Sequence, residues 1–453
     1  MLYHKIVIRF GKKRPWLYLP AEIKVREFEA KVLIASMAAS RGFNVVFGDV
    51  APVLKVARNG PPGVFMFKDC SYPMMETFRE LHELGHRVCV HDEEGLVVFN
   101  DEIFLNFRVD NRSAQYVDLF FAWGKEQEKI LLKKIEPERV ARTGHPRFDI
   151  LRRDLRGIFD EDVRDIQERY GRFILINSNL GAWNHQDGPE GYIRICKEQE
   201  ALDNPEDVDF YVRYQNHVKG LWDRYVPLVR RLAEDFPQHS IVVRPHPVED
   251  VGTWERLMAN EPRVFVDDDG TVAKWIYAAD VVVHTNCTTA IESIAMETPV
   301  FSYLPSYDPE FDCDLPNDFS KVCRTDDELS AALSCCVGGE GFASFGEQRV
   351  LLKQYVSAIE GDFSASRIVD QLERIALPSE KMRVSLRHTL LPKLRLEFDR
   401  MLGKSKSTQK WPHTSLIEVQ ELVSRYCHFL VSLKNIKIAH LGRNLFSFFS
   451  INK

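Results

Sequence analysis

The chain has 453 residues, of which 45% are hydrophobic and 28% charged, and its formal net charge is -6. This length predicts two domains with an appendage, and the acidic balance argues against a nucleic-acid binder. We expect no secretory signal, and no apolar run reaches the about 18 residues that a spanning helix needs. Its nine cysteines include no Cys-x-x-Cys pair, so we expect a cytoplasmic protein in a reducing compartment.

Short apolar runs alternate with helical patterns in the first part of the chain. Strands are predicted at residues 16–19, 44–47, 63–67, 87–90, 119–123 and 140–143. A helix is predicted over residues 25–40, where Phe28, Val32 and Ser36 recur on one face. Strands separated by helices predict right-handed βαβ units on a parallel sheet.

The same scheme is repeated in the second part. Strands are predicted at 173–177, 241–244, 264–266, 281–284 and 300–303, and helices at 218–235, 253–258, 271–279 and 289–297. The predicted fold class is therefore α/β, with two Rossmann-like domains facing a central cleft. We expect domains at 1–160 and 161–378, followed by a helical tail at 379–453.

The tail differs from the body in charge. From Lys381 onward it holds 14 Lys or Arg and 4 Asp or Glu, a net charge of +10. Apolar residues recur at helical spacing from Leu416 to Leu433, and a second apolar stretch runs from Ile436 to Ile451. This composition predicts a peripheral contact with the anionic inner face of the cytoplasmic membrane. A helical hairpin that packs on the body, or on a second subunit, explains the pattern equally well.

The segment from Ile241 to Pro247 reads Ile-Val-Val-Arg-Pro-His-Pro. Pro245 ends a buried strand and Pro247 fixes the chain as it leaves the sheet. His246 is thus held at the carboxyl edge, where α/β sheets bind ligands. There Arg244 and His246 can hold a phosphate and stabilise a departing nucleotide.

A second polar segment, His284-Thr-Asn-Cys-Thr-Thr-Ala-Ile-Glu-Ser293, follows a strand and opens a helix. Thr285, Thr288 and Thr289 add hydroxyls to the backbone N–H groups of a helix start, which predicts an anion site. A capping box formed by Thr289 and Glu292 is the alternative without a ligand.

Other polar residues are predicted at strand ends. Asn177 and Ser178 are expected to contact the nucleotide, and Arg147 to hold a phosphate or a donor carboxylate. Asp149 is predicted to cap the next helix. The triplet Asp267-Asp-Asp269 is interpreted as a turn and a helix cap, and no metal site is predicted.

Together these motifs resemble a known group of enzymes. The Arg-Pro-His-Pro turn and the threonine-rich helix start resemble motifs of bacterial transferases with cytidine-nucleotide donors. His91-Asp-Glu-Glu-Gly-Leu96, Thr143-Gly-His-Pro-Arg-Phe-Asp149 and Asn177-Ser-Asn resemble the surface carbohydrate biosynthesis proteins, a group similar to capsule and lipopolysaccharide Kdo transferases. The resemblance covers residues 15–375. It implies the two-Rossmann GT-B fold, with His246 and Thr285 to Thr289 at the donor phosphate.

Three acids, Asp92, Glu93 and Glu94, follow a predicted strand of the first domain. Sugar transfer needs a carboxylate as base or nucleophile, although three consecutive acids are also typical of a solvated loop. We expect a glycosyltransferase that moves Kdo, or a related ulosonic acid, from a CMP donor to a surface polysaccharide or lipopolysaccharide acceptor. No other cofactor is expected. A CDP-glycerol-type glycerophosphotransferase and an inactive scaffold subunit are the alternatives.

Overall fold

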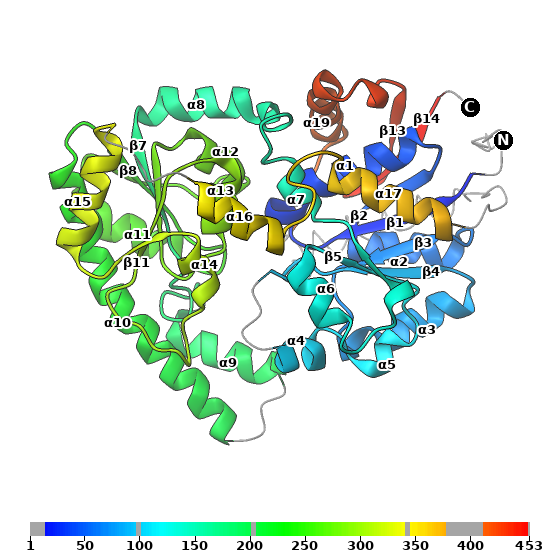
Figure 1. Cartoon of the computed structure of the whole chain (residues 1–453), viewed down its shortest axis with the longest axis horizontal. Helices are drawn as coiled ribbons and strands as arrows, with labels where there is room; N and C mark the ends of the chain where they lie inside the picture. The colour runs from blue at the N-terminus through cyan, green and yellow to red at the C-terminus, as the bar shows by residue number, and fades with distance from the viewer. Residues whose placement is uncertain (1–13, 97–100, 201–204, 340–344, 377–410, 452–453) are drawn as a thin grey trace, which may run out of the picture. The chain divides into compact units, whose positions relative to one another are not determined.

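The computed structural model describes residues 14–96, 101–200, 205–339, 345–376 and 411–451 (Figure 1). These residues form two compact units, and each is considered by itself. The first unit contains the described residues up to Ile158 and from Lys353 onward, and the second is Phe159–Leu352. The predicted α/β class is confirmed, because a sheet of mainly or wholly parallel strands with helices packed around it forms the centre of each unit.

The sheet of the first unit has the order β13-β14-β2-β1-β3-β4-β5-β6, and β1 to β6 are parallel. Its parallel strands are β1 (Trp16–Ala21), β2 (Asn44–Asp49), β3 (Val64–Phe67), β4 (Arg87–His91), β5 (Leu119–Ala122) and β6 (Val140–Arg142). Every residue of β1 is buried, as expected for a central strand that is covered on both faces. The strand order reverses between β1 and β3.

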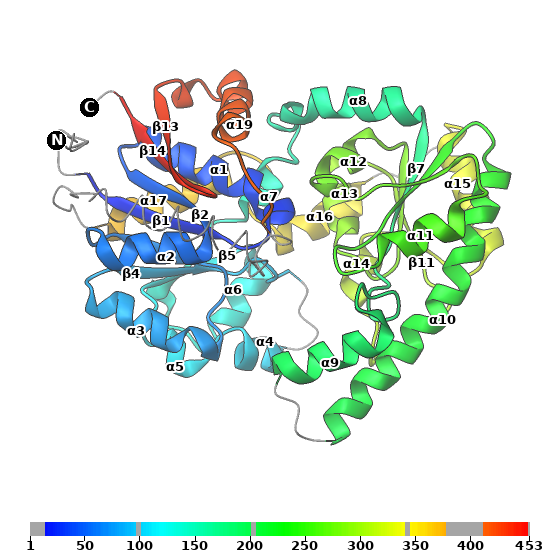
Figure 2. The same ribbon diagram turned by 180° about the vertical axis from the view of Figure 1, so that it is seen from behind.

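Helices cover this sheet, and the crossovers between the strands supply most of them (Figure 2). The helices of the first unit are α1 (Lys24–Ser40), α2 (Val50–Asn59), α3 (Met75–Glu83), α4 (Asp101–Phe107), α5 (Asn111–Ala114), α6 (Lys125–Leu131), α7 (Pro146–Asp149), α17 (Ser364–Ile375) and α19 (Leu416–Phe429). Val53 of α2 and Phe78 of α3 pack with Tyr18 and Phe65 of the sheet in one apolar core. Helices α17 and α19 both pack against α1.

The C-terminal segment belongs to the first unit. Trp411 is fully buried and contacts Phe28 of α1 and Phe47 of β2. The helix predicted from Leu416 is present as α19, but a helix over 436–451 is wrong. This stretch forms the hairpin β13 (Ile436–Gly442) and β14 (Leu445–Ser450), and β14 pairs antiparallel with β2 (Figure 2). The unpaired edge of β2 provides the hydrogen-bond partners that favour a strand.

The units therefore differ from the predicted division. Residues 353–376 return to the first unit, because Asp149 accepts hydrogen bonds from the first backbone N–H groups of α17. The prediction that Asp149 caps the next helix in the chain is wrong for the same reason.

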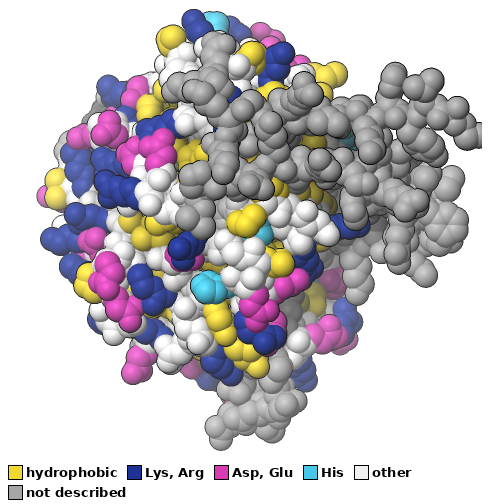
Figure 3. All heavy atoms as spheres, turned by 90° about the vertical axis from the view of Figure 1, so that its right-hand side faces the viewer, with side chains coloured by type: hydrophobic (Ala, Val, Ile, Leu, Met, Phe, Trp, Pro, Cys, Tyr) yellow, Lys and Arg dark blue, Asp and Glu magenta, His cyan; other side chains and the backbone are white. Residues whose placement is uncertain are grey.

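The described tail residues, 411–451, hold four Lys or Arg and two Glu, so most of the basic charge lies outside them. On the face drawn in Figure 3, basic and acidic side chains of the described residues are interspersed.

The sheet of the second unit has the order β12-β11-β10-β7-β8-β9, with all strands parallel. This is the doubly wound Rossmann order, and it reverses between β7 and β10. The strands are β7 (Phe173–Asn177), β8 (Ser240–Arg244), β9 (Val264–Val266), β10 (Val281–His284), β11 (Val300–Tyr303) and β12 (Lys321–Cys323). Four of them, β7, β9, β10 and β11, have the predicted bounds.

The helices of the second unit are α8 (Asp160–Tyr170), α9 (Gly188–Glu200), α10 (Pro205–Asp235), α11 (Val251–Met258), α12 (Val272–Ala278), α13 (Thr289–Met296), α14 (Asp314–Asp318) and α15 (Asp326–Val337). The chain returns to the first unit within α16 (Gly346–Tyr355), after Leu352. Tyr225 of α10, Trp254 of α11 and Leu329 of α15 pack with strand residues such as Ile176 and Val243 in one core. Helices α8, α12 and α13 are packed together.

Candidate functional site

The predicted donor residues of the second unit lie at the point where its strand order reverses. Asn177, the last residue of β7, is in register with Arg244 of β8 and His284 of β10. The side chain of Asn177 is buried, and neither its amide oxygen nor its amide nitrogen has a hydrogen-bond partner among the described residues. A buried amide without partners is costly, so this edge of the sheet has unused capacity to bind a polar ligand.

Threonine hydroxyls add to this capacity on the neighbouring strand. Thr285 is buried, and its hydroxyl lies near that of Tyr225, but neither has hydrogen-bond geometry to a described residue. The hydroxyl of Thr289 is also unpartnered among them. Helix α13 begins at Thr289 with Thr288 as its N-cap, and the side chain of Thr288 makes no capping hydrogen bond. The capping box of Thr289 and Glu292 is therefore not formed.

His246 lies in the turn after β8. Its ring Nδ1 accepts a hydrogen bond of 3.4 Å from the backbone N–H of Val248. A neutral imidazole that accepts at Nδ1 carries its proton on Nε2, which makes Nε2–H a donor suited to a phosphate oxygen. His246 and the Thr285 segment flank β7 at the same edge of the sheet.

Glu249 holds this turn in place, and the sequence interpretation overlooked it. Its buried carboxylate accepts hydrogen bonds from the backbone N–H groups of His246 (3.2 Å) and Leu180 (2.9 Å), from the hydroxyl of Ser178 (2.8 Å) and from the indole N–H of Trp254 (2.8 Å). Burial raises the pKa of Glu249. The hydroxyl of Ser178 donates to Glu249, and its predicted contact with a nucleotide stays a prediction. Only the close approach of β7 and β8 reveals the network.

Arg244 has a different environment from the predicted one. Its guanidinium donates to the backbone carbonyls of Asp269 (3.1 Å) and Gly270, and burial lowers its pKa to about 10. The carboxylate of Asp267 accepts from the hydroxyl of Tyr170 (2.7 Å), and that of Asp269 pairs with Lys274 (2.7 Å). The acidic triplet therefore forms a turn held by Arg244, although Thr271 is the N-cap of α12. Donor binding by Arg244 stays a prediction.

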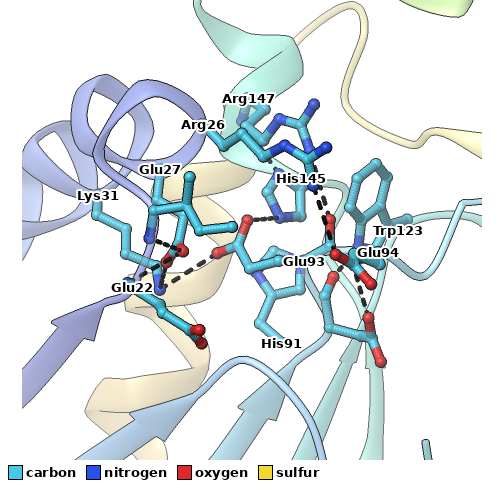
Figure 4. Close-up of polar contacts among 12 residues, drawn as sticks. Glu22, Arg26, Glu27, Lys31, His91, Glu93, Glu94, Trp123, His145 and Arg147 are labelled. Atoms are coloured by element: carbon cyan, nitrogen blue, oxygen red, sulfur yellow. Dashed lines mark hydrogen bonds and ion pairs between the residues drawn. The ribbon is translucent and has the colours of Figure 1, made fainter. Parts of the chain in front are cut away.

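In the first unit, the structure separates the three candidate acids. Asp92 is buried and bonded to Arg108 through both carboxylate oxygens, at 2.7 and 2.9 Å. Glu94 is exposed (58% of its side chain) and pairs with Arg26 and Arg108. Glu93 is 11% exposed and lies between Lys31 (3.3 Å) and His145 (3.3 Å) (Figure 4). Among the three acids, Glu93 is thus the mostly buried one that has no bidentate arginine partner, and its contact with His145 does not have hydrogen-bond geometry.

Arg147 lies beside this cluster. Its guanidinium donates to the backbone carbonyl of Glu93 at 3.4 Å and approaches the ring of Trp123. His145 and Lys31 were not predicted as site residues. The motif that contains His145 signals a polar strand end, whereas Lys31 is one position within an amphipathic helix and carries no such signal.

Comparisons with known proteins leave the family open. No protein-family model matches the chain, and no curated protein matches it. Three similar solved structures each share 11% sequence identity with this chain and cover 80% of it. The wall teichoic acid polymerase TagF with CDPG has a TM-score of 0.46, with 88% of that chain covered. Anabaena HepE with UDP-glucose has a TM-score of 0.43 (98% of that chain covered), and UDP-GlcNAc 2-epimerase of Neisseria meningitidis with UDP-GlcNAc has a TM-score of 0.47 (99% covered). Since all three TM-scores are below 0.5, no conclusion rests on these likenesses. Among the described residues, no helix combines the length and apolarity needed to cross a bilayer.

Proposed function

We propose that the chain is a glycosyltransferase whose second unit binds the phosphate of a nucleotide-sugar donor. One observation carries this proposal: among the described residues, Asn177 and Thr285 have unpartnered polar side chains at the strand ends where the order of a Rossmann sheet reverses, and Thr289 adds an unpartnered hydroxyl at the start of α13. Doubly wound sheets bind nucleotides at that point. The start of α13, which the side chain of Thr288 does not cap, adds backbone N–H groups, which favour an anion.

The finer assignment is a CMP-linked ulosonic acid such as Kdo, with a surface polysaccharide or lipopolysaccharide acceptor. It rests on the resemblance of the sequence motifs. His246 then stabilises the charge that develops on the departing nucleotide. The closest alternative reaction, transfer of glycerol phosphate from a CDP donor, uses the same edge of the sheet.

Thermal-shift titration with CMP, CDP, UDP and GDP tests the donor site, because a ligand that binds only the folded state raises the melting temperature. We expect CMP to give the largest shift. A larger shift with CDP supports the glycerophosphate alternative. No shift with any nucleotide contradicts the proposal and supports a scaffold subunit.

Two matched variants locate the binding. Thr285→Val removes an unpartnered hydroxyl, so it should weaken CMP binding about tenfold with little loss of stability. Thr298→Val is the control, since the hydroxyl of Thr298 donates to the carbonyl of Ile276 (3.0 Å) beyond the other end of α13. It should cost about 1 kcal/mol of stability and leave CMP binding unchanged.

A further inference from the structure

A network of hydrogen-bonded polar side chains borders the donor turn of the second unit, which is formed by residues 285–289. Its centre is Asn286, which follows Thr285 at the end of β10 and precedes the start of α13. Asn286 has a φ of 46°, in the left-handed region that asparagine tolerates better than most residues other than glycine. Contacts with the rest of the unit are therefore needed to hold this conformation.

Three groups of Asn286 have hydrogen-bond partners in neighbouring segments. Its side-chain N–H donates to the carboxylate of Asp312. Its amide oxygen accepts from the side chain of Asn317 (3.1 Å), and its backbone carbonyl accepts from that of Asn179 (3.0 Å). Asn179 follows β7, whereas Asp312 and Asn317 lie after β11, in and before α14, which packs against α13 (Figure 1). The segments after both neighbours of β10 thus fix the donor turn.

Asp312 connects this turn to α10. Only 1% of its side chain is exposed. One oxygen accepts from both Asn286 and Nε2 of His217 (3.0 Å), and the other accepts from the backbone N–H of Asp308 (2.7 Å). A carboxylate only accepts hydrogen bonds, so the imidazole of His217 carries a proton on Nε2. The hydrogen bond to Asp312 raises the pKa of His217 above its usual value, although burial opposes the rise.

We propose that Asp312 and His217 are positioning residues of the donor site. Through Asn286 they fix the donor turn, so that the hydroxyl of Thr285 and the first N–H groups of α13 are directed at the phosphate before the nucleotide binds. This inference rests on the proposed function. Donors that are held in place before binding cost no ordering when the ligand arrives. Weakening the network should consequently lower the affinity for the nucleotide without removing any group that contacts it.

Nuclear magnetic resonance of ring-¹⁵N-labelled histidine tests the network without any ligand. In the wild type, the neutral ring of His217 should be the Nε2–H tautomer, with a pKa above the usual 6.5. Asp312→Asn should lower this pKa by about one unit or more, because it removes a neighbouring negative charge. The other charged group that acts on the ring is Asp308, whereas Arg213, one turn earlier on α10, is paired with Glu310. An Nδ1–H tautomer, or an unchanged pKa in Asp312→Asn, would overturn the network.

Calorimetric titration with CMP tests the positioning role. Asn286→Gly keeps the left-handed conformation accessible but removes the side-chain hydrogen bonds, so the affinity for CMP should fall about five- to tenfold. His217→Phe keeps a ring beside Phe311, whose centroid lies 5.5 Å away, but loses the N–H donor and should also weaken binding. His217→Gln, whose amide N–H can replace Nε2–H, should retain nearly the wild-type affinity. The double variant Asn286→Gly/His217→Phe should bind CMP no more weakly than Asn286→Gly, because both residues act through Asp312.

Asn444→Gly is the matched control. Asn444 also has a left-handed φ, of 50°, and its side chain accepts from the N–H of Thr414 (2.9 Å), but it lies in the first unit. This variant should bind CMP like the wild type. Unchanged affinity in Asn286→Gly, equal losses in the two His217 variants, or additive losses in the double variant would overturn the positioning role. If the wild type binds no nucleotide, the proposed function and the positioning role both fail, and the magnetic resonance result shows separately whether the network exists.

Discussion

The carboxylate of Asp149 accepts a hydrogen bond of 2.8 Å from the backbone N–H of Ser364, which lies 215 residues further along the chain. Its second oxygen accepts from the N–H of Ala365, also at 2.8 Å. Asp149 thus caps the start of α17 and joins the two ends of the first unit. Since the side chain is fully buried, its ionisation is linked to folding.

Asp149→Asn should make stability less dependent on pH. Burial raises the pKa of Asp149 from 3.8 to about 7, so the folded state holds this proton more tightly than the unfolded state. The contribution of Asp149 is present below pH 3.8 and is lost as the pH rises through about 7. Urea unfolding across this window should show a steeper loss in the wild type than in Asp149→Asn. Parallel curves would refute the linkage.

Substitutions at Glu249 and His246 should separate stability from turnover. Glu249→Ala leaves several buried donors without an acceptor, so it should cost about 3 kcal/mol and also lower turnover by displacing the His246 turn. His246→Ala should lower turnover at least about tenfold with an unchanged melting temperature. Glu255→Gln, at an exposed position of α11, is the control for both. Unchanged kinetics in His246→Ala would remove His246 from the mechanism.

Arg108→Met should destabilise the first unit by about 3–5 kcal/mol, because it leaves the buried carboxylate of Asp92 unpaired. Glu94→Gln should change the free energy of unfolding by less than about 0.5 kcal/mol, as expected for an exposed residue. Chemical denaturation measures both. A small effect of Arg108→Met would contradict a stabilising role for this ion pair.

Trp411→Ala should cost the first unit about 3–5 kcal/mol, since the indole is fully buried against Phe28 and Phe47. Ile417→Ala, at a position 65% exposed on α19, should have almost no effect. The unfolding free energies of these variants decide whether residues 411–451 are part of the folded unit, and equal values would argue that they are not.

Membrane attachment through the basic tail stays a prediction, and charge reversal tests it better than truncation. Deleting the tail would also remove β14, which pairs with β2. Replacing Lys404, Lys406 and Lys410 by Glu leaves that strand intact and should release the chain from anionic vesicles, because basic residues contribute about 1 kcal/mol each near such a surface. Cosedimentation measures this. Binding that persists, or never occurs with the wild type, would favour a role in packing alone.

Local patterns predicted the parallel strands β1 to β11, most of which are apolar runs that end in polar or turn residues. The short strand β12, of which only Cys323 is buried, was not predicted. The hairpin β13–β14 was missed, since the edge strand that it completes lies nearly 400 residues earlier in the chain. The same limit applies to the site. Strand ends indicated Asn177, His246, Thr285 and the three acids, but the different surroundings of those acids became visible only with the positions of Arg108, Lys31 and His145.

The sequence by itself determined the alternation of strands and helices, and with it the edge of each sheet where polar side chains gather. Periodicity and turn residues are local, so they can be read without knowing what a segment packs against. The tertiary structure alone decided which of these side chains are already engaged. The hydrogen bond from the Ser364 N–H to Asp149, and the ion pair between Arg108 and Asp92, depend on distances that are set only when distant segments pack together.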